Sequence, residues 1–455
     1  MSENIKVVKN ATCTFCGCVC DDMELTVDID EKRITKAKNA CVLGRAWFAE
    51  HVIEEDRPPA MIDGKAVSVA EAIEEAAQVL TKAKFPITYG LSDTTCEAQR
   101  QAVAITDIIH GTIDTTTSVC HGPSGLAFQG IGESTMTLGE IKNRADLIIY
   151  WGGNPAESHP RHFAKYTVTP KGMFTPNGKR DRTVVLVDVR KTPSTPVADI
   201  LLTVKPGKDF ELLWALRALV KGKRIDPDIE SITGISLDTL QDLVQRMKTC
   251  RYGVLFFGMG LTMTRGRHFN SGALLALATD LNEFTHFVAK PVRGHGNVTG
   301  ADNVVSWQTG YPFGVNFSLG YPRFNPGEFT TVDTLSRGDA DAALIIASDP
   351  ASNFPRAAID HLHKIPVISL DTKATITSKL AHVAFATATY GINTSGTVYR
   401  MDDVPITLRK AFDSPFPTDE EILTAIKKRV HELVLAKRGA TGARGEAKAA
   451  SPQLL

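Results

Sequence analysis

The sequence predicts an α/β protein in which a small cysteine-rich domain precedes two related α/β domains. Three observations carry this prediction. Five of the eight cysteines lie within the first 41 residues. Apolar runs of strand and helix length then alternate along most of the chain, which is typical of parallel sheets covered by helices. One strand–turn–strand pattern occurs twice, at residues 145–188 and again at 340–371.

Length and charge limit the classes of function. The 455 residues are enough for about three domains of ~150 residues each. Lys+Arg and Asp+Glu both number 51, so no net field attracts nucleic acid or an acidic membrane. No apolar run reaches the ~18 residues of a spanning helix, and residues 1–11 are polar. We therefore expect a cytoplasmic protein that binds neither nucleic acid nor membrane.

The N-terminal cysteines have the spacing of cluster ligands. Cys13, Cys16 and Cys20 form a Cys-x2-Cys-x3-Cys run, and Cys41 follows 21 positions after Cys20. Four thiolates at this spacing suit an iron–sulfur cluster. A zinc site would more often use two well-separated pairs, and a disulfide knot would suit a secreted chain. We assign Cys20 rather than Cys18 as the third ligand, because its spacing gives the wider loop.

The next elements follow from local signals. Residues 55–59 predict a linker, and Ser68 with Glu71 predicts a capping box that opens a helix. A short strand at 87–90 and a helix at about 97–110 follow. Residues 115–124 are polar with a Gly-Pro turn, which predicts a loop. This loop contains Cys120 and His121, which could form a nucleophile, a metal site or an incidental pair.

The repeated pattern is typical of nucleotide binding. The strand at 145–151 runs into a glycine turn with Gly153, and the strand at 183–188 ends at Asp188. The second copy ends its strands at Asp349 and Asp371. A turn at a strand end can offer backbone N–H groups to phosphate, and a terminal acid can bind a ribose hydroxyl. Two copies suggest two related sites or one long shared ligand, although strand ends commonly carry such residues.

Three further segments carry candidate site residues. Gly258 and Gly260 would let the backbone approach a ligand. Arg293, in a glycine-rich loop, is either a carboxylate clamp or a surface charge. His159 and His162 lack an evident third zinc ligand, so we expect them at the surface.

Together these motifs resemble the molybdopterin oxidoreductases, and most closely the catalytic B subunits of formylmethanofuran dehydrogenase. The resemblance covers about residues 6–430. Its motifs are the cysteine run at 13–22, Ser-Val-Cys-His-Gly-Pro-Ser at 118–124, His-Pro-Arg-His at 159–162, Asp188-x-Arg190-Lys191-Thr192, Phe-Phe-Gly-Met-Gly at 256–260, Arg293-Gly294-His295, Gly-Tyr-Pro at 310–312, Ser348-Asp349-Pro350 and Gly-Thr-Val-Tyr-Arg-Met at 396–401.

The resemblance implies a domain plan. Residues 1–55 would form the iron–sulfur domain, 56–114 and 300–434 one Rossmann-like α/β domain, and 115–299 a second one in pseudo-twofold relation to it. The superfamily's C-terminal β-barrel domain would be absent and supplied by a separate small subunit. Residues 435–455 would be a disordered tail.

The resemblance also implies cofactors and sites. A 4Fe-4S cluster would bind Cys13, Cys16, Cys20 and Cys41, and Cys120 would bind tungsten or molybdenum held by two molybdopterin guanine dinucleotides. Of the catalytic residues, His121 would manage the proton and Arg293 would hold CO2 or formate. Leu43 stands where many relatives place a lysine. The other residues implied to bind cofactor are Gly153, Asn154, Pro155, Asp188, Arg190, Thr192, Asp209, Gly258, Met259, Gly260, Asp349 and Asp371.

The implied reaction is the reversible two-electron reduction of CO2 to formate, for the pathway of methanogenesis. A hydrolase-like subunit would condense that formate with methanofuran, and the other implied partners are a β-helical subunit and polyferredoxin subunits. Two alternatives stand beside this reading. One is a formate dehydrogenase-type subunit of another complex. The other is a scaffold subunit of a formyltransferase/hydrolase complex, which would need neither the cluster cysteines nor Cys120.

Overall fold

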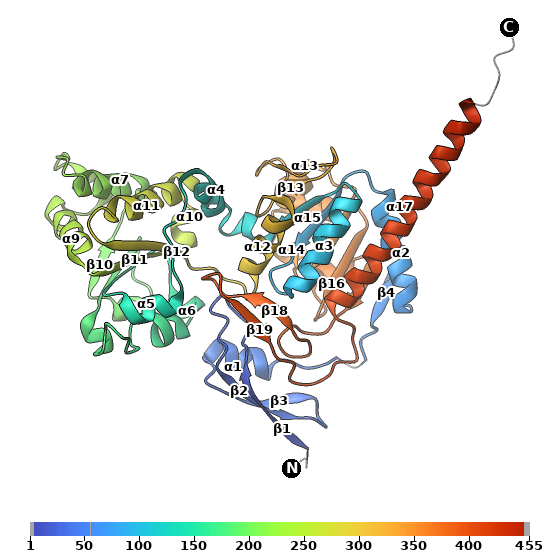
Figure 1. The fold of residues 1–455 in the computed structure, drawn as a ribbon, viewed down its shortest axis with the longest axis horizontal. Helices are drawn as coiled ribbons and strands as arrows, with labels where there is room; N and C mark the ends of the chain where they lie inside the picture. Colours follow the sequence, from blue (N-terminus) through green and yellow to red (C-terminus); the bar gives the residue numbers. More distant parts are fainter. Residues whose placement is uncertain (1–3, 55, 450–455) are drawn as a thin grey trace, which may run out of the picture.

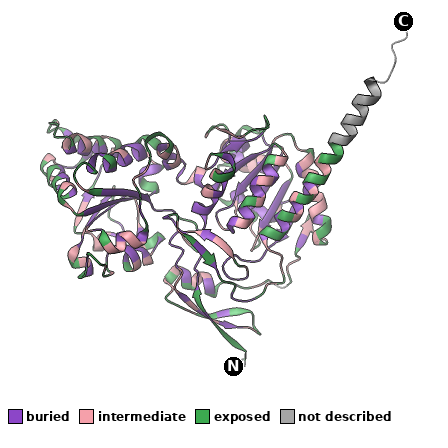
Figure 2. Ribbon diagram, viewed as in Figure 1, coloured by how far each residue is buried: buried purple, intermediate pink, exposed green. Residues whose placement is uncertain are grey.

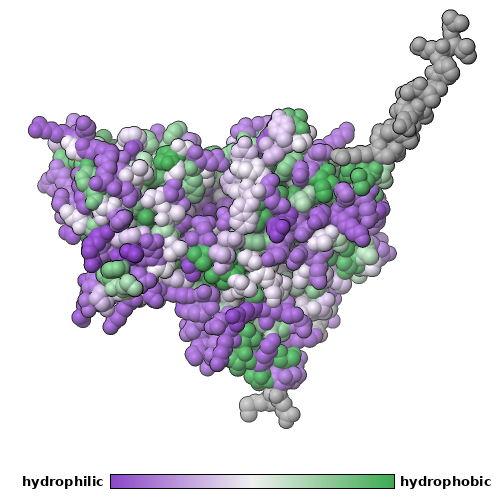
Figure 3. Space-filling view, viewed as in Figure 1, coloured by the Kyte–Doolittle hydropathy of each residue, from purple (hydrophilic) through white to green (hydrophobic). Residues whose placement is uncertain are grey.

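The computed structural model describes residues 4–54 and 56–449, with side chains up to residue 437. Two lobes lie side by side, and a small N-terminal domain lies below them (Figure 1). Within the described residues, no helix combines the length and the apolar character that crossing a membrane requires. On the face shown in Figure 3, hydrophilic residues predominate and apolar ones form separate patches.

The N-terminal domain is a three-stranded antiparallel sheet with one helix. Its strands are β1 (Ile5–Ala11), β2 (Met23–Asp28) and β3 (Arg33–Lys38), and α1 (Val42–Ala49) follows. Apolar residues of the sheet, including Leu25, pack with Phe48 of α1. The β1–β2 connection and the start of α1 therefore lie together, which brings residues 13–20 close to Cys41.

The first lobe is built on a five-stranded parallel sheet in the order β10-β9-β8-β11-β12. The strands are β8 (Leu147–Trp151), β9 (Thr183–Asp188), β10 (Ile200–Thr203), β11 (Tyr252–Phe257) and β12 (His286–Pro291). The helices around it are α4 (Gly122–Ile131), α5 (Leu138–Arg144), α6 (Pro155–Ser158), α7 (Asp209–Val220), α8 (Ile229–Thr233), α9 (Leu237–Thr249), α10 (Met259–Thr262) and α11 (His268–Leu281), with a π-helical turn at Phe163–Thr167. Alternate residues of its strands fall into separate apolar clusters, which explains their continuous apolar runs.

The second lobe is built on a nine-stranded sheet in the order β14-β13-β7-β6-β15-β16-β17-β4-β5. Its strands are β4 (Ala60–Ile62), β5 (Lys65–Ala66), β6 (Pro86–Gly90), β7 (Thr112–Thr115), β13 (Val315–Asn316), β14 (Arg323–Phe324), β15 (Ala342–Ile346), β16 (Val367–Asp371) and β17 (Val383–Ala386). Its helices are α2 (Val69–Lys82), α3 (Cys96–Ile108), α12 (Val298–Thr309), α13 (Thr331–Arg337), α14 (Pro350–Asn353), α15 (Arg356–Leu362), α16 (Ile376–Leu380) and α17 (Asp419–Ala449). A hairpin of β18 (Gly396–Tyr399) and β19 (Pro405–Leu408) lies between this lobe and the N-terminal domain (Figure 1).

The two lobes repeat one arrangement. The central strands β17-β16-β15-β6-β7 are all parallel and follow the same order as β10-β9-β8-β11-β12. Asp146, just before β8, accepts hydrogen bonds from two backbone N–H groups at the start of β11. Asp341, just before β15, accepts two from the residues before β6. The predicted internal repeat is therefore a repeat of structure, and the central strands of both sheets are buried (Figure 2).

Of the local structural predictions, one is confirmed and two differ from the structure. The capping box is confirmed, because Ser68 Oγ accepts from the Glu71 N–H and Glu71 Oε2 accepts from the Ser68 N–H. The predicted loop at 115–124 contains a 3-10 turn, Thr116–Val119, and the start of α4. The predicted tail differs as well. Helix α17 continues past 435 because that segment is rich in alanine, lysine and arginine, which favour helix, and residues 450–455 lie outside the described residues.

Candidate active site

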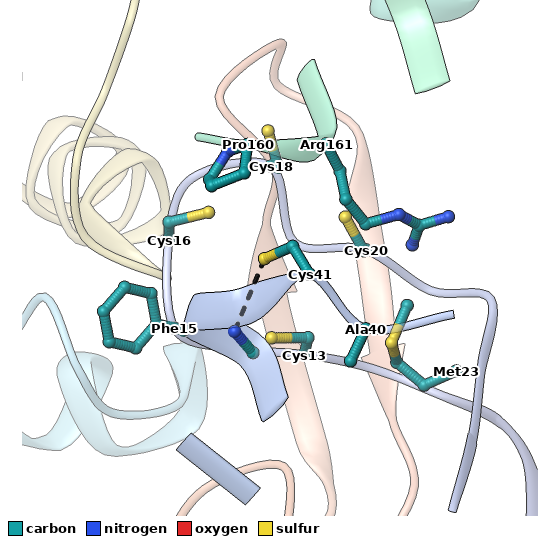
Figure 4. Close-up of a pocket in the computed structure, with 11 residues that line it drawn as sticks. Cys13, Phe15, Cys16, Cys18, Cys20, Met23, Ala40, Cys41, Pro160 and Arg161 are labelled. Atoms are coloured by element: carbon teal, nitrogen blue, oxygen red, sulfur yellow. Dashed lines mark hydrogen bonds between the residues drawn. The ribbon is translucent and has the colours of Figure 1, made fainter. Parts of the chain in front are cut away.

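Five thiols line one small pocket of the N-terminal domain (Figure 4). Cys13, Cys16, Cys18 and Cys20 come from the β1–β2 connection, and Cys41 caps the N-terminus of α1. The Gly44 N–H donates to Cys41 Sγ at 3.4 Å. A Cβ at Gly44 would lie 3.1 Å from Cys13 Sγ. The glycine therefore lets the start of α1 approach the other cysteines.

The thiol set suits a cluster better than a single ion. Within the described part of the chain, no three His, Cys, Asp or Glu side chains converge closely enough to hold one metal ion. A zinc ion draws its ligands to about 2.0–2.3 Å. The thiolates of an iron–sulfur cluster bind separate irons, so their sulfur atoms surround a larger volume. Here the five thiols line one pocket, and the cluster itself stays a prediction.

Basic side chains from the first lobe lie beside these thiols. Arg161 donates to both Asp22 oxygens at 2.6 Å, and Lys165 donates to Asp22 at 2.9 Å. A hydrogen bond from the Cys18 thiol, with the charges of Lys165 and Arg161, lowers the pKa of Cys20 to about 7. Hydrogen bonds to Cys16 and Cys20 instead raise the pKa of Cys18. Both thiols line the same pocket, so the assignment of Cys20 rather than Cys18 as the third ligand stays a prediction.

The expectation of surface histidines is wrong. His159 is 1% exposed and His162 is fully buried. His159 Nε2 donates to the Arg293 carbonyl at 2.7 Å, and His162 Nδ1 lies 3.0 Å from the Tyr150 hydroxyl. Local polarity suggested exposure, but this segment is packed between the cysteine loop and the first lobe. Burial lowers the pKa of His159 to about 4, so its ring is neutral.

Cys120 lines a cavity, and a second cavity shares lining residues both with this one and with the cysteine pocket. Cys120 follows the 3-10 turn after β7, and its N–H donates to the Thr117 carbonyl at 3.0 Å. It lines a cavity of about 900 Å³. A cavity of about 680 Å³ is lined by Cys16 and Leu43 and shares a wall with the first. The shared residues are Asp93, His295, Ala347, Ser348 and Asp349.

Two candidate catalytic side chains, His121 and Arg293, are buried and line neither cavity. His121 is 1% exposed, its Nδ1 lies 3.2 Å from Ser124 Oγ, and its Nε2 has no partner. Burial lowers the pKa of His121 to about 3, so the ring is neutral. Arg293 is 7% exposed, which excludes the surface-charge alternative. Its Nη2 donates to Asp302 Oδ2 at 2.5 Å and to Thr117 Oγ1 at 2.6 Å, while its Nε has no partner.

The predicted cofactor-binding residues divide into two groups. Asp349 and Asp371 line the 680 Å³ cavity, and Met259 and Asp349 line the 900 Å³ cavity. The others gather near the carboxyl ends of β8 to β11 and line neither cavity: Gly153, Asn154, Pro155, Asp188, Arg190, Thr192, Asp209, Gly258 and Gly260. Asp209 is 3% exposed, accepts from Trp151 Nε1 at 2.8 Å, and leaves Oδ2 without a partner.

The two glycines after β11 pack against a neighbouring turn. The Gly260 N–H donates to the Gly152 carbonyl at 2.9 Å. A Cβ at Gly258 would lie 2.6 Å from the same carbonyl oxygen. Both glycines therefore allow two neighbouring turns to pack backbone to backbone, and their expected approach to a ligand stays a prediction.

Sequence reasoning missed Asp302. Its side chain is 13% exposed and pairs with Arg293. The signal present in the sequence was helical spacing, because Val298, Asp302 and Val305 fall at i, i+4 and i+7 of α12, on one face. A carboxylate on a buried helix face needs a partner, and that partner is Arg293.

Two curated relatives decide the family. The chain is 44% identical over 441 residues to the B subunit of tungsten-containing formylmethanofuran dehydrogenase 2 from Methanocaldococcus jannaschii, covering 94% of this chain and all of that relative. It is 43% identical over 437 residues to the protein of the same name from Methanococcus maripaludis, with the same coverage. The chain belongs to the family of formylmethanofuran dehydrogenase B subunits. The predicted family is thus confirmed. None of the protein-family models searched matches the chain.

Solved structures show that this B-subunit fold is shared more widely. The formyltransferase/hydrolase complex of Methylorubrum extorquens, solved with methylofuran, contains a chain with a TM-score of 0.67 at 24% identity, covering 83% of this chain and 99% of that one. Acetylene hydratase from Pelobacter acetylenicus gives a TM-score of 0.69 at 12% identity, covering 93% and 70%. At these identities the likeness concerns the fold, and it confirms the predicted α/β fold class.

Proposed function

We propose that this chain carries the redox centre of a formylmethanofuran dehydrogenase and reduces CO2 to formate reversibly. The reaction takes CO2, two electrons and one proton to HCOO⁻. One observation carries the proposal: a cavity that shares lining residues with the five-thiol pocket also shares lining residues with the cavity of Cys120. In this arrangement electrons would enter at the thiol pocket, the reaction would occur at Cys120, and a long cofactor would lie in the cavities between them.

The residues present fit the expected groups. Cys13, Cys16, Cys20 and Cys41 would hold the 4Fe-4S cluster, and Cys120 would be the soft protein ligand of tungsten or molybdenum. Cavities of 680 and 900 Å³ are of the size that holds large ligands. Through Met259, Asp349 and Asp371 they would hold part of the two molybdopterin guanine dinucleotides, and the residues at the ends of β8 to β11, which line neither cavity, would bind the rest. When bound, the metal–pterin group supplies the two-electron chemistry.

The protein's own residues would position the substrate and the proton. The buried Arg293 guanidinium keeps its charge, and it would attract the oxygens of CO2 or formate and stabilise negative charge that develops on them. The neutral His121 ring has an unpartnered Nε2 that can hold a proton. Because Arg293 is buried, bulk water is kept from its charge, and the electrostatic effect of that charge is strengthened.

The formate would be consumed in a larger complex. The relatives are named as B subunits, which supports a multi-subunit assembly. We propose as partners a small barrel subunit that completes the pterin site, a hydrolase-like subunit that condenses formate with methanofuran, a β-helical subunit and ferredoxin-like polyferredoxin subunits. Each should co-purify with this chain in the active complex.

The test is metal analysis together with dye-linked turnover of the purified complex. We expect tungsten or molybdenum in proportion to this chain, formate oxidation with a viologen acceptor, and conversion of labelled CO2 to formate with reduced viologen. A complex that condenses formate with methanofuran, but contains neither metal and shows no redox turnover, would make this chain a scaffold and refute the proposal.

A further inference from the structure

Asp302 is the centre of a buried group of hydrogen bonds. Its Oδ1 accepts from Thr115 Oγ1 at 2.9 Å. Thr117 Oγ1 lies 2.8 and 2.9 Å from its two oxygens, and Arg293 Nη2 donates to Oδ2 at 2.5 Å. Arg293 Nη2 also donates to Thr117 Oγ1 at 2.6 Å, so Asp302, Thr117 and Arg293 form a closed ring.

This ring joins equivalent points of the two halves. Thr115 and Thr117 lie at the end of β7 in the second lobe, and Arg293 lies just beyond β12 in the first. These two strands hold the same place in their sheets, each at the end of the repeated five-strand order. Asp302 therefore fixes where the carboxyl ends of two symmetry-related strands meet.

The ring is connected directly to Cys120. The Cys120 N–H donates to the Thr117 carbonyl, so a shift of Thr117 displaces the backbone that carries the thiol. Arg293 and Asp302 are also the charged side chains that act on this thiol, with opposite signs. One carboxylate thus restrains both the Cys120 loop and the guanidinium beside it.

We propose that Asp302 is a positioning residue for the CO2/formate reaction. It holds the Cys120 loop and the Arg293 side chain in the relative positions that the reaction needs, without touching the substrate. This inference rests on the proposed function. The inference makes two chemical requirements of Asp302. Its carboxylate must be charged, to compensate the charge of Arg293, and it must accept several hydrogen bonds, to hold two threonine hydroxyls.

A structural ion pair of the same kind provides the control. Asp280 on α11 has a side chain 10% exposed and accepts from Arg217 Nε at 2.8 Å. It belongs to the first lobe and lines neither cavity. Asp280→Asn therefore removes a comparable partly buried charge pair without touching the Cys120 loop.

The variants are made in the intact complex. Asp302→Asn keeps the size of the side chain and removes its charge, and Thr117→Val removes a hydroxyl with little change in shape. Thr117→Ser restores the hydroxyl and is the conservative rescue. Thr117→Val also keeps the inference testable if Asp302→Asn does not assemble.

Three measurements are compared across these variants: kcat and KM for formate with a dye acceptor, the paramagnetic signals of the metal centre and the cluster, and amide exchange of residues 115–122. For Asp302→Asn and Thr117→Val we expect kcat to fall by about ten- to a thousandfold, the effect of misplacing catalytic groups. We also expect a shifted tungsten or molybdenum signal, an unchanged cluster signal and faster exchange at 115–122. Thr117→Ser and Asp280→Asn should retain the parent's kcat and metal signal.

Parent-like kcat and an unshifted metal signal in Asp302→Asn would overturn the inference, even if exchange became faster. An activity loss that only follows loss of metal would do the same. Failure of the proposed function would be visible in the parent complex, as absence of both metals and of formate oxidation. Failure of this inference would be visible only in the variants.

Discussion

Asn154 and Asp349 occupy equivalent positions in the two halves of the molecule. Each precedes a proline that opens a one-turn helix, with φ −124° and ψ 72° at Asn154 and φ −123° and ψ 68° at Asp349. Two positions earlier, Gly152 has φ 57° and Ala347 has φ 47°. A positive φ is uncommon for alanine, so the turn keeps its shape even where no glycine supports it. The two halves therefore present matching turns at equivalent strand ends.

The five-thiol pocket predicts different outcomes for two neighbouring cysteines. Cys20→Ala should lose or convert the cluster, because a four-thiolate site loses a ligand. Cys18→Ala should retain iron and the cluster signal, since Cys18 is assigned no iron. Iron content and low-temperature paramagnetic spectra of the two purified variants provide the measurement. A cluster that survives Cys20→Ala but not Cys18→Ala would reverse the assignment.

Gly44→Ala should reduce cluster content although it removes no ligand. The added Cβ would lie 3.1 Å from Cys13 Sγ, so this sulfur would have to shift by a few tenths of an ångström, whereas Cys41 Sγ at 3.8 Å would be in ordinary contact. Gly139→Ala is the matched control, because its Cβ would meet only Thr137 Oγ1, at an ordinary 3.7 Å. Iron per chain is measured for both, and equal iron in the two variants would show that the approach of Gly44 is not needed.

Much of the fold could be predicted because its signals are local. The strands at 147–151 and 342–346 are buried on both faces, so each appears as a continuous apolar run followed by an Asn-Pro or Asp-Pro turn. Their similarity in sequence predicted the structural repeat. The cysteine spacing likewise predicted thiols around one pocket, since a short loop cannot carry them far apart.

The contacts of the site could not be predicted in the same way. Thr117 and Arg293 meet because β7 and β12 are related by the repeat, and their 176-position separation leaves no local signal. His159 and His162 appeared to be surface residues because burial there depends on how the cysteine loop packs against the first lobe. Gly258 packs against the turn at Gly152, a contact between distant segments that has no local signal.

Arg293→Lys should lower formate turnover by about ten- to a thousandfold, the range for losing one oxyanion-type donor. Lysine keeps the positive charge but lacks the planar guanidinium of arginine. Arg293 uses one nitrogen to bond Asp302 and Thr117 and has further N–H groups left for the substrate, which lysine cannot reproduce. Arg217→Lys, in the ion pair with Asp280, is the control and should keep parental turnover. Steady-state kcat/KM for formate measures both. Equal values for Arg293→Lys and the parent would place Arg293 away from the reacting centre.

The pH dependence of stability should show the contribution of His382. Its ring lies 2.9 Å from Glu75 and 2.8 Å from Asp63, and these carboxylates raise the pKa of His382 in the folded protein. A raised folded pKa stabilises the fold below the unfolded value of about 6.5, and the contribution disappears as pH rises through the folded pKa. The Tm difference between the parent and His382→Gln should therefore shrink from about pH 6 toward pH 9. A difference that grows over this range would contradict the assignment.

The central claim is that Cys120 binds the metal at which CO2 reacts, while the cluster is bound by Cys13, Cys16, Cys20 and Cys41. Dye-linked formate oxidation of the Cys120→Ala complex, measured with its iron content and reduced-cluster signal, tests this claim most directly. Loss of a ligand acts first on its own metal, so we expect turnover to be abolished while the iron and the cluster signal stay at the parent's level. A fully active Cys120→Ala complex would contradict the account.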